Sequence, residues 1–519
     1  MAIRYLQRQL QRRDSGQLTT AAMAPRRHPV QAIAFAESAS PKFYLAVADT
    51  LSCISAGTTI ATWKAPAAPV QGKPQQKVVT GKDHETDAAG AAEHEPVEST
   101  GDSPSSIPAP VVGKRKRSPS NASAQSPTPV TTEAANAGAA DPSSPATAPR
   151  TSKKMNKKGG NTAGADAPKK QSPNYIGHLL FVSSKNVLAV TTLEDKTLRV
   201  LHADTLAVVK EWTLHKRPSA ISITDGDSTI LVGDKFGDVY SYSIDDEAST
   251  TTDGTLLLGH VSLLTALTAA STTAQRHFII TADRDEHVRV TNYPLTHCIH
   301  TFCLGHTAFV SRLLITSSNT LISGGGDDWL GVWDWSAGKL LQQVDVRGVL
   351  DGLFTADEMK KIAETMRGYN RRRRWMREDD AVREDSGEEE AKITIAVNGI
   401  VEVAALEGQQ VIVTVEGLPV LLRYSYASTG ELQFAGGIRT LGPVLSLAVD
   451  ASRVYFGCDA QDGGLLSQVD LANAEPAVTS LTFGDEVDVQ VVDEDVEGMV
   501  ERVYTVEGLR KGFGGWEDE

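Results

Sequence analysis

The chain has 519 residues, of which 40% are hydrophobic, and a formal net charge of −14 at pH 7. That length suits one large β domain with additional segments, although it also leaves an α/β fold open. The acidic balance argues against a protein that grips nucleic acid with its whole surface, because phosphate binding requires concentrated lysine and arginine, but local basic patches stay open.

The cysteines and the hydropathy pattern narrow the class of protein further. Cys53, Cys298, Cys303 and Cys458 lie far apart or in unmatched strands, which is typical of a reduced intracellular protein. We expect no zinc site and no other cofactor, because no Cys/His ligand cluster occurs. No apolar run reaches the roughly 18 residues of a membrane span. The first thirteen residues are basic and contain no acid, as in a mitochondrial presequence. Basic tracts farther along the chain favour targeting to another compartment.

The β pattern begins near the N-terminus. Residues 30–35, 43–47 and 59–63 alternate apolar and polar side chains, and polar turns separate them at 49–50 and 57–58. We therefore expect residues 1–66 to form an N-terminal arm and a first β unit.

Residues 67–172 have a different composition, rich in Pro, Ala, Ser, Thr, Gly and Lys. Such a segment buries too little apolar surface to offset its ordering entropy, so we expect it to be disordered. It contains the basic run Lys114, Arg115, Lys116 and Arg117, which predicts a nuclear import signal. A weak polyanion contact and a simple solvated linker are the alternatives.

The β pattern resumes after Pro173 and continues to residue 354. Residues 176–183, 187–192, 198–202 and 207–212 form one unit of four predicted strands, and residues 220–224, 229–232, 239–244 and 255–258 form another. Two further units open on Gly259-His260 and Gly305-His306, and the second of these closes on Trp333-Asp334. This spacing is that of a WD repeat, whose unit is one four-stranded propeller blade.

The residue types of the last unit predict a buried polar network. Counting back from Trp333, Asp327 falls in a tight turn, Ser323 on the preceding strand and His306 in the loop before it. An imidazole between a hydroxyl and a carboxylate satisfies all three groups, and the indole N–H is a further donor. We expect these residues to hold the fold rather than to catalyse a reaction.

The same register, applied one unit earlier, predicts a second network of His260, Thr281 and Asp285. Thr291 stands there in place of the tryptophan, so this network should be shorter.

A helical insertion is predicted at residues 355–392. Thr355 and Glu358 have the spacing of a capping box, and Met359, Ile362, Ala363 and Met366 recur at helical spacing. The pattern runs into a basic group beside Trp375, a candidate tRNA contact formed by Arg371, Arg372, Arg373 and Arg374. The alternative is that these arginines pair with the acids of residues 378–390.

Residues 393–519 contain the remaining β units, at 393–435 and 444–469, and a C-terminal tail. Seven units in total predict an all-β protein, a seven-bladed WD-repeat β-propeller with a long disordered insertion after the first blade and a short helical insertion after the fifth. Either the N-terminal arm or residues 502–506 would supply the last strand of the ring.

The runs ITADRDEHVRV, FCLGHTAFVSR, LISGGGDDWLGVWDW and GDKFGDVYSYS resemble a known family. They are similar to the WD-repeat, non-catalytic subunit of the eukaryotic, fungal-like tRNA (guanine-N7-)-methyltransferase complex. The resemblance is dense over residues 221–342, and DRDEH and GDKFGDVYS are its specific parts. It gives no counterpart for the linker.

The resemblance implies a scaffold in a heterodimer rather than an enzyme. In the family, a separate catalytic subunit binds S-adenosylmethionine and methylates a guanine in the tRNA variable loop, while the propeller docks on its side. The family's basic residue after the DRDEH-type run pairs with an acid of that subunit, and Arg289 occupies its place here. Arg284, Glu286 and His287 are its predicted partner-binding neighbours.

The residues themselves predict no chemistry of the chain's own. Gly324, Gly325 and Gly326 precede a strand and not a helix, so no helix N-terminus awaits a phosphate. The glycines near residue 512 precede no helix either. A general nuclear WD-repeat adaptor for another protein complex is the alternative function, and an enzyme built on a propeller is a third class.

Overall fold

The computed structural model describes residues 26–27, 29–37, 41–67, 173–224, 226–245, 254–375, 394–406, 408–427, 431–460, 466–481, 491–492 and 504–510. All of them belong to one compact unit of the chain. The predicted linker from residue 68 onward, the run Lys114–Arg117, the acid-rich stretch and the C-terminal glycines lie outside these residues. The side chains of residues 367–375 lie outside them as well.

Seven antiparallel four-stranded sheets make up the unit, and each sheet takes its strands in sequence order. Blades 1 to 4 consist of β2 (Ala32–Ala36), β3 (Lys42–Val47), β4 (Thr50–Ser55), β5 (Thr58–Lys64); β6 (Ile176–Val182), β7 (Val187–Thr192), β8 (Thr197–His202), β9 (Val208–Thr213); β10 (Pro218–Ile223), β11 (Thr229–Asp234), β12 (Asp238–Ser243), β13 (Thr255–Gly259); and β14 (Leu264–Ser271), β15 (His277–Asp283), β16 (Val288–Tyr293), β17 (Ile299–Cys303).

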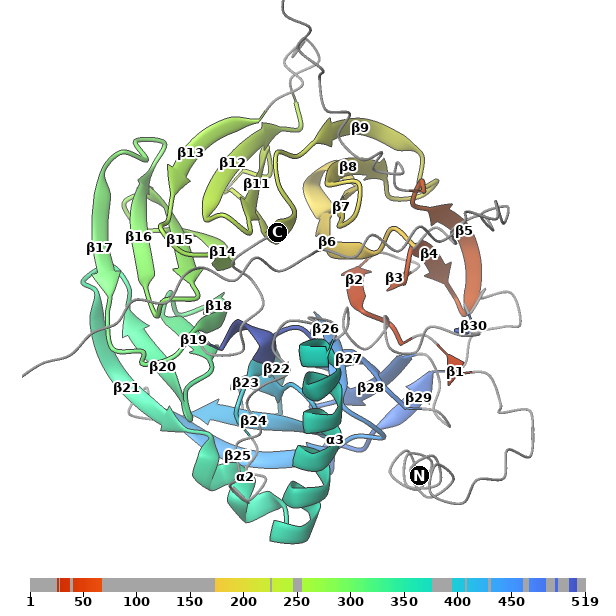
Figure 1. Ribbon diagram of the computed structural model, residues 1–519, viewed down its shortest axis with the longest axis vertical. Coiled ribbons are helices and arrows are strands. Elements are labelled where there is room, and N and C mark those ends of the chain that lie inside the picture. Colours follow the sequence, from red (N-terminus) through yellow and green to blue (C-terminus); the bar gives the residue numbers. More distant parts are fainter. Residues whose placement is uncertain are drawn as a thin grey trace, which may run out of the picture. The chain divides into compact units, whose positions relative to one another are not determined.

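Blades 5 to 7 consist of β18 (Val310–Ile315), β19 (Leu321–Gly325), β20 (Trp329–Asp334), β21 (Lys339–Asp345); β22 (Val397–Ala405), β23 (Gly408–Val415), β24 (Val420–Tyr426), β25 (Leu432–Arg439); and β26 (Val444–Asp450), β27 (Arg453–Cys458), β28 (Leu466–Asp470), β29 (Thr479–Leu481). The sheets stand around a central axis, as Figure 1 shows, and the seven-bladed β-propeller predicted from the sequence is confirmed.

The innermost strands of neighbouring blades pack against each other all the way round, and β2 meets β26 where the ring closes. Side chains beside or on six of these strands also bond to the next blade. They donate to backbone carbonyls in the pairs Gln31 to Ile176, His178 to Ser219, Thr265 to Val310, Ser311 to Val397, Asn398 to Val444 and Ser446 to Val30. These bonds satisfy buried groups and fix one blade to the next.

Two details of the ring differ from the sequence expectations. The first blade has a strand, β4, that begins at Thr50, where the sequence pattern predicts only a turn. The outermost strand of the last blade is β29, so neither the N-terminal arm nor residues 502–506 supply it. Instead β1 (Arg26–Arg27) pairs with β30 (Val491–Val492) in a separate two-stranded sheet. The closing strand depends on pairing partners that no local pattern specifies.

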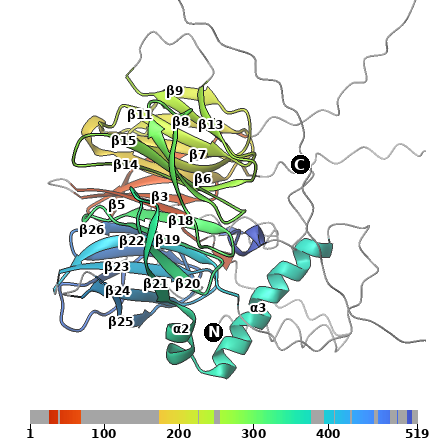
Figure 2. The same ribbon diagram turned by 90° about the vertical axis from the view of Figure 1, so that its left-hand side faces the viewer.

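Two helices follow the fifth blade, α2 (Arg347–Leu353) and α3 (Ala356–Trp375). The predicted capping box is confirmed, since the backbone N–H of Thr355 donates to Glu358 Oε2 (2.8 Å) and the N–H of Glu358 to Thr355 Oγ1 (3.3 Å). Ala363 is buried and Met359 and Ile362 pack beside it. Figure 2 shows α3 rising from one side of the ring, with its C-terminal end away from the blades.

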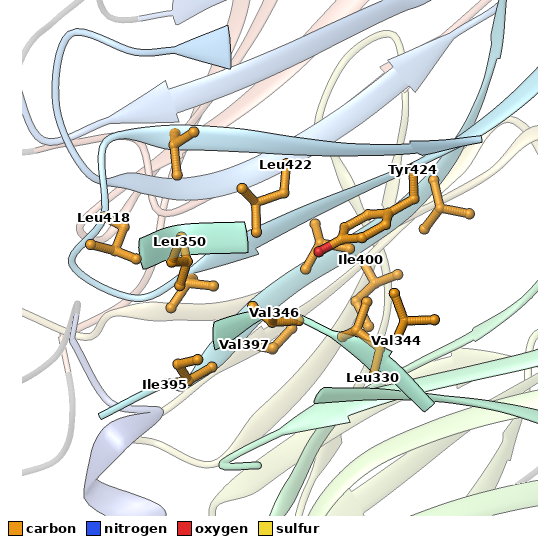
Figure 3. Close-up of a cluster of buried hydrophobic side chains, with 14 of the residues drawn as sticks. Leu330, Val344, Val346, Leu350, Ile395, Val397, Ile400, Leu418, Leu422 and Tyr424 are labelled. Atoms are coloured by element: carbon orange, nitrogen blue, oxygen red, sulfur yellow. The ribbon is translucent and has the colours of Figure 1, made fainter. Parts of the chain in front are cut away.

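The hydrophobic core lies between blades rather than at the centre of the ring. The cluster in Figure 3 joins blades 5 and 6, where Leu330 and Val344 face Ile400 and Tyr424. Leu350 of α2 enters the same cluster, so the short helix seals this joint. Burial of such surfaces contributes roughly 25 cal/mol per Å² of apolar area, which makes the joints the main source of stability.

Candidate functional site

The structure brings together the four residues that the sequence predicted for blade 5. His306 Nδ1 lies 2.7 Å from Asp327 Oδ2, and its Nε2 lies 2.7 Å from Ser323 Oγ. The indole N–H of Trp333 donates to the same oxygen at 2.7 Å. With a neutral imidazole, Nδ1–H donates to the carboxylate and the serine hydroxyl donates to Nε2. Every polar group of the network then has its partner.

This network fastens a loop to a turn. His306 also stacks on Trp329, with ring centroids 4.6 Å apart. Burial raises the pKa of the Asp327 carboxyl, but hydrogen bonds from His306 and Thr307 outweigh it, and the pKa ends below its usual range. Both oxygens of this buried carboxylate accept hydrogen bonds from the protein itself, which fits a structural role.

The network of blade 4 contains a different acid from the one expected. His260 Nε2 lies 2.7 Å from Thr281 Oγ1, as predicted, but its Nδ1 meets Asp283 Oδ2 at 2.9 Å. The assignment of Asp285 to this network is therefore wrong. Asp283 Oδ1 also accepts the backbone N–H groups of Asp285 (2.9 Å) and His287 (3.0 Å).

Strand register explains the shift of two residues. Asp283 pairs with Leu264 at the end of its strand, and Gly325 occupies the equivalent place opposite Val310 in blade 5. Because glycine has no side chain, blade 5 uses the acid two residues later. Blade 4 has an acid at the strand end itself, which reaches the histidine first. Asp283 and Asp285 are both present in the DRD sequence, and only the strand register shows which of them bonds to His260.

Arg289 lies on the third strand of blade 4. Val288 and Val290 on either side of it are fully buried, so the side chain of Arg289 points to the opposite face of the strand. Its Nη1 donates to the carbonyl of Gly259 at 3.0 Å. Its Nε and Nη2 are buried and without a hydrogen-bond partner, and within the described part of the chain Arg289 forms no ion pair. In particular, no ion pair joins Arg289 to the nearby acids Asp285 and Glu286 in this part of the chain.

The electrostatic environment of Arg289 is that of an unneutralised cation. Burial lowers the pKa of its guanidinium, and the carboxylate of Asp283, already engaged by His260, opposes the shift. An arginine has five N–H donors, and one bond leaves most of them unsatisfied. A desolvated charge of this kind is stabilised when a carboxylate approaches it.

The other three predicted partner-binding residues lie in the turn between β15 and β16. Arg284 Nε is 3.9 Å from Asp285 Oδ1, and Glu286 has a φ of 76°, in the left-handed region, where the chain turns. His287 Nδ1 is 3.5 Å from Asp283 Oδ1, and about half of its side chain is exposed. The turn therefore contains both basic and acidic side chains close to Arg289 in the sequence.

Exposed apolar side chains flank this edge, and sequence reasoning missed them. Phe302 is the cross-strand partner of Arg289 and is 38% exposed, and Leu304 is 62% exposed. The signal was present in FCLGH, because an outermost strand that buries Cys303 by alternation turns Phe302 and Leu304 outward. An exposed apolar patch beside an unpaired cation is typical of an interaction surface.

The remaining predicted residues stand apart from this edge. Arg371–Arg374 lie in the last turns of α3, whose backbone is helical, and their side chains are outside the described residues. The described residues contain no group of three potential metal ligands. Gly324 and Gly325 end a strand and lead through a turn into β20, as expected for a blade turn. No helix in the described ranges has the length and apolarity to cross a bilayer.

A closed ring of seven four-stranded blades, two of which contain His–Ser/Thr–Asp networks, defines a WD-repeat β-propeller. The chain belongs to the family described as the tRNA methyltransferase TRM82 WD40 domain, which matches residues 44–254 and 244–469.

Curated relatives carry the name tRNA (guanine-N(7)-)-methyltransferase non-catalytic subunit. The protein of Debaryomyces hansenii is 38% identical over 191 residues, which cover 35% of this chain and 43% of that protein. That of Saccharomyces cerevisiae S288c is 35% identical over 211 residues, 38% of this chain and 48% of its own. The match therefore spans about half the length of these relatives. For Candida glabrata it reaches 340 residues at 31% identity, 62% of this chain and 73% of that protein.

Proposed function

We propose that this chain is the non-catalytic scaffold subunit that binds and stabilises the catalytic subunit of the tRNA (guanine-N7-)-methyltransferase. In this role it is required for N7-methylguanine formation in the tRNA variable loop. Family membership and the names of the relatives support the complex. The observation that carries the docking step is Arg289, a half-buried cation with two N–H groups that lack a partner.

Docking would complete the hydrogen bonding of Arg289. Because Nε and Nη2 are buried in the chain by itself, the Arg289 side chain would turn outward on docking, and a carboxylate of the catalytic subunit would then bind its guanidinium through two parallel bonds. Arg284, Glu286 and His287 would contact the same partner around it, and Phe302 and Leu304 would supply the apolar contact area. Such an arrangement places a charged pair among apolar side chains, where loss of either charge is costly.

The chain on its own would transfer no methyl group and would bind no S-adenosylmethionine. Cofactor sites of this kind use a glycine-rich turn that opens a helix. The only triple glycine of the described residues, Gly324–Gly326, leads into a strand. Calorimetry of the purified chain with the cofactor should give no heat of binding, and micromolar binding would exclude the scaffold role.

Two further parts of the proposal concern tRNA and the nucleus. The arginines at the end of α3, Arg371–Arg374, would contact tRNA held by the complex, since clustered arginines bind phosphate groups. The run Lys114–Arg117 would direct the chain to the nucleus. Alanine in place of these four residues should reduce nuclear accumulation of a fluorescent fusion and leave complex formation unchanged.

Co-purification of the tagged chain from its native cell, followed by mass spectrometry, tests the core of the proposal. A methyltransferase at equal stoichiometry is expected. Recovery of other complexes without a methyltransferase would favour the general nuclear adaptor. Reconstitution supplies the functional readout, because methylation of tRNA by the catalytic subunit should rise when the chain is added.

A further inference from the structure

Residues 504–510, here called the C-terminal strap, lie across three blades. The strap includes the short helix η2 (Glu507–Leu509), the dark blue segment near the centre of Figure 1. Figure 2 places that helix on the same side of the ring as α3. Tyr504 and Val506 are almost fully buried, so the strap is an integral part of this surface.

The strap contacts the same structural position in each of three successive blades. Tyr504 Oη donates to Asp459 Oδ2 of blade 7 at 2.8 Å, and the backbone N–H of Val506 donates to Glu416 Oε1 of blade 6 at 2.8 Å. Arg510 Nη2 donates to the carbonyl of Gly326 in blade 5 at 2.9 Å. Each of these blade residues directly follows the second strand of its sheet.

Apolar contacts and a second carbonyl reinforce the attachment. Val506 and Leu509 pack on Phe309 and Ala396, and the Arg510 guanidinium lies 5.6 Å from the centre of the Phe309 ring. Arg510 Nη2 also donates to the carbonyl of Ile395 at 2.9 Å. Without the strap, Phe309 and Ala396 would lose the apolar side chains that pack on them.

In blades 6 and 7 the strap donates hydrogen bonds to a buried acid, as a histidine does in blades 4 and 5. In blade 4 the turn acid Asp283 is satisfied by His260 and by its own turn. No histidine precedes β22 or β26 within blades 6 and 7. Their acids, Glu416 and Asp459, are 6% and 9% exposed and accept hydrogen bonds from the strap. Buried carboxylates need such donors.

Glu416 extends the link into the ring. Burial lowers the pKa of the Arg312 guanidinium on the innermost strand of blade 5, and the carboxylate of Glu416 opposes the shift. Arg312 Nε in turn donates to the carbonyl of Asn398 in blade 6 at 2.8 Å. The charge of Glu416, which the strap hydrogen-bonds, therefore also acts on an arginine at the joint between blades 5 and 6.

We propose that this face of blades 5 to 7 is a peptide-binding site, which the chain fills with its own C-terminal strap to complete blades 6 and 7. The site recognises the sequence Tyr-x-Val-x-x-Leu-Arg through one phenol, one backbone N–H, two aliphatic side chains and one guanidinium. Because the strap covers this face, another protein would bind at the exposed edge of blade 4 instead.

The first test compares two shortened chains. A chain that ends at residue 500 should melt about 5 °C or more below the full chain, whereas a matched control that ends at residue 510 should melt with it. A synthetic peptide of residues 501–512 should bind the shorter chain and raise its melting temperature. Binding should saturate below about 1 mM, the effective concentration that a short tether supplies. The same peptide with Arg510→Ala should bind about tenfold more weakly.

Equal melting of both shortened chains, or no binding of the peptide, would overturn the proposal. If the chain that ends at residue 500 does not fold, point variants of the full chain decide. Tyr504→Phe should speed amide exchange at residues 458–460, and Arg510→Ala should speed it at residues 326 and 395–396. Thr505→Ala, whose side chain is exposed, should not. Unchanged exchange in both strap variants would reduce the strap to an inert tail.

Discussion

Blades 4 and 5 both begin with a Gly-His pair, but their hydrogen-bond networks differ in completeness. In blade 5, His306, Ser323, Asp327 and Trp333 form a closed network in which every polar group has a partner. In blade 4, Thr291 replaces the tryptophan, and its buried hydroxyl has no partner. Beside it Arg289 keeps two unpartnered N–H groups. A blade with complete hydrogen bonding stabilises the ring, and one with incomplete bonding at its edge can still gain from a second protein.

The largest effect should come from Arg289→Leu. Loss of one side of a desolvated interfacial ion pair typically costs about 2 to 5 kcal/mol. The variant should therefore bind the purified catalytic subunit at least about tenfold more weakly, as measured by calorimetry. Its melting temperature should stay near that of the unchanged chain, because its one internal bond goes to a carbonyl at the edge. Lowered melting with undiminished affinity would make Arg289 a structural residue.

The next largest effect should come from the closed network of blade 5. His306→Ala leaves the carboxylate of Asp327 and the hydroxyl of Ser323 without their shared partner. We expect a loss of about 1 to 3 kcal/mol in the free energy of unfolding. Urea unfolding would measure it, and affinity for the catalytic subunit should change only through unfolding. Unchanged stability would show that the network is dispensable.

A smaller effect separates the two acids of blade 4. Asp283→Asn should cost about 1 to 2 kcal/mol, whereas Asp285→Asn, outside the network, should stay within roughly 0.5 kcal/mol. Burial raises the pKa of Asp283, and its bonds to His260 and His287 lower it below the usual range overall. Its contribution is therefore present above the unfolded-state pKa and is lost as the pH falls through the folded-state pKa. Asp283→Asn should flatten the acid limb of a stability-against-pH profile. Equal effects of the two variants would contradict the register.

The smallest effect, with the opposite sign, should come from Thr291→Val. Valine keeps the shape and removes a buried hydroxyl that has no partner, so stability should rise by up to about 1 kcal/mol. The matched change in blade 5, Ser323→Val, should lower stability, because that hydroxyl bonds to both His306 and Trp333. If both changes act in the same direction, the contrast between the two blades fails.

Features that depend on residues close together along the chain could be predicted before the structure was known. Alternation predicted the strands, the capping box at Thr355 and Glu358 predicted α3, and the spacing of Gly-His and Trp-Asp predicted the closed network around His306. In each case the interacting residues are at a fixed distance along one strand, turn or helix. The exposure of Phe302 could also have been predicted, because the next residue, Cys303, is buried and alternation turns Phe302 to the other face of the strand.

Other features became visible in the folded chain alone, because in them residues compete for a partner or meet from distant parts of the sequence. The choice of Asp283 over Asp285 depends on the register against Leu264. The outer strand of blade 7 and the strap bonds to Asp459, Glu416 and Gly326 join segments whose separation no local pattern encodes. The entropy cost of closing such long loops depends only weakly on their length. Packing and hydrogen bonding, rather than distance along the sequence, therefore decide which segments come together.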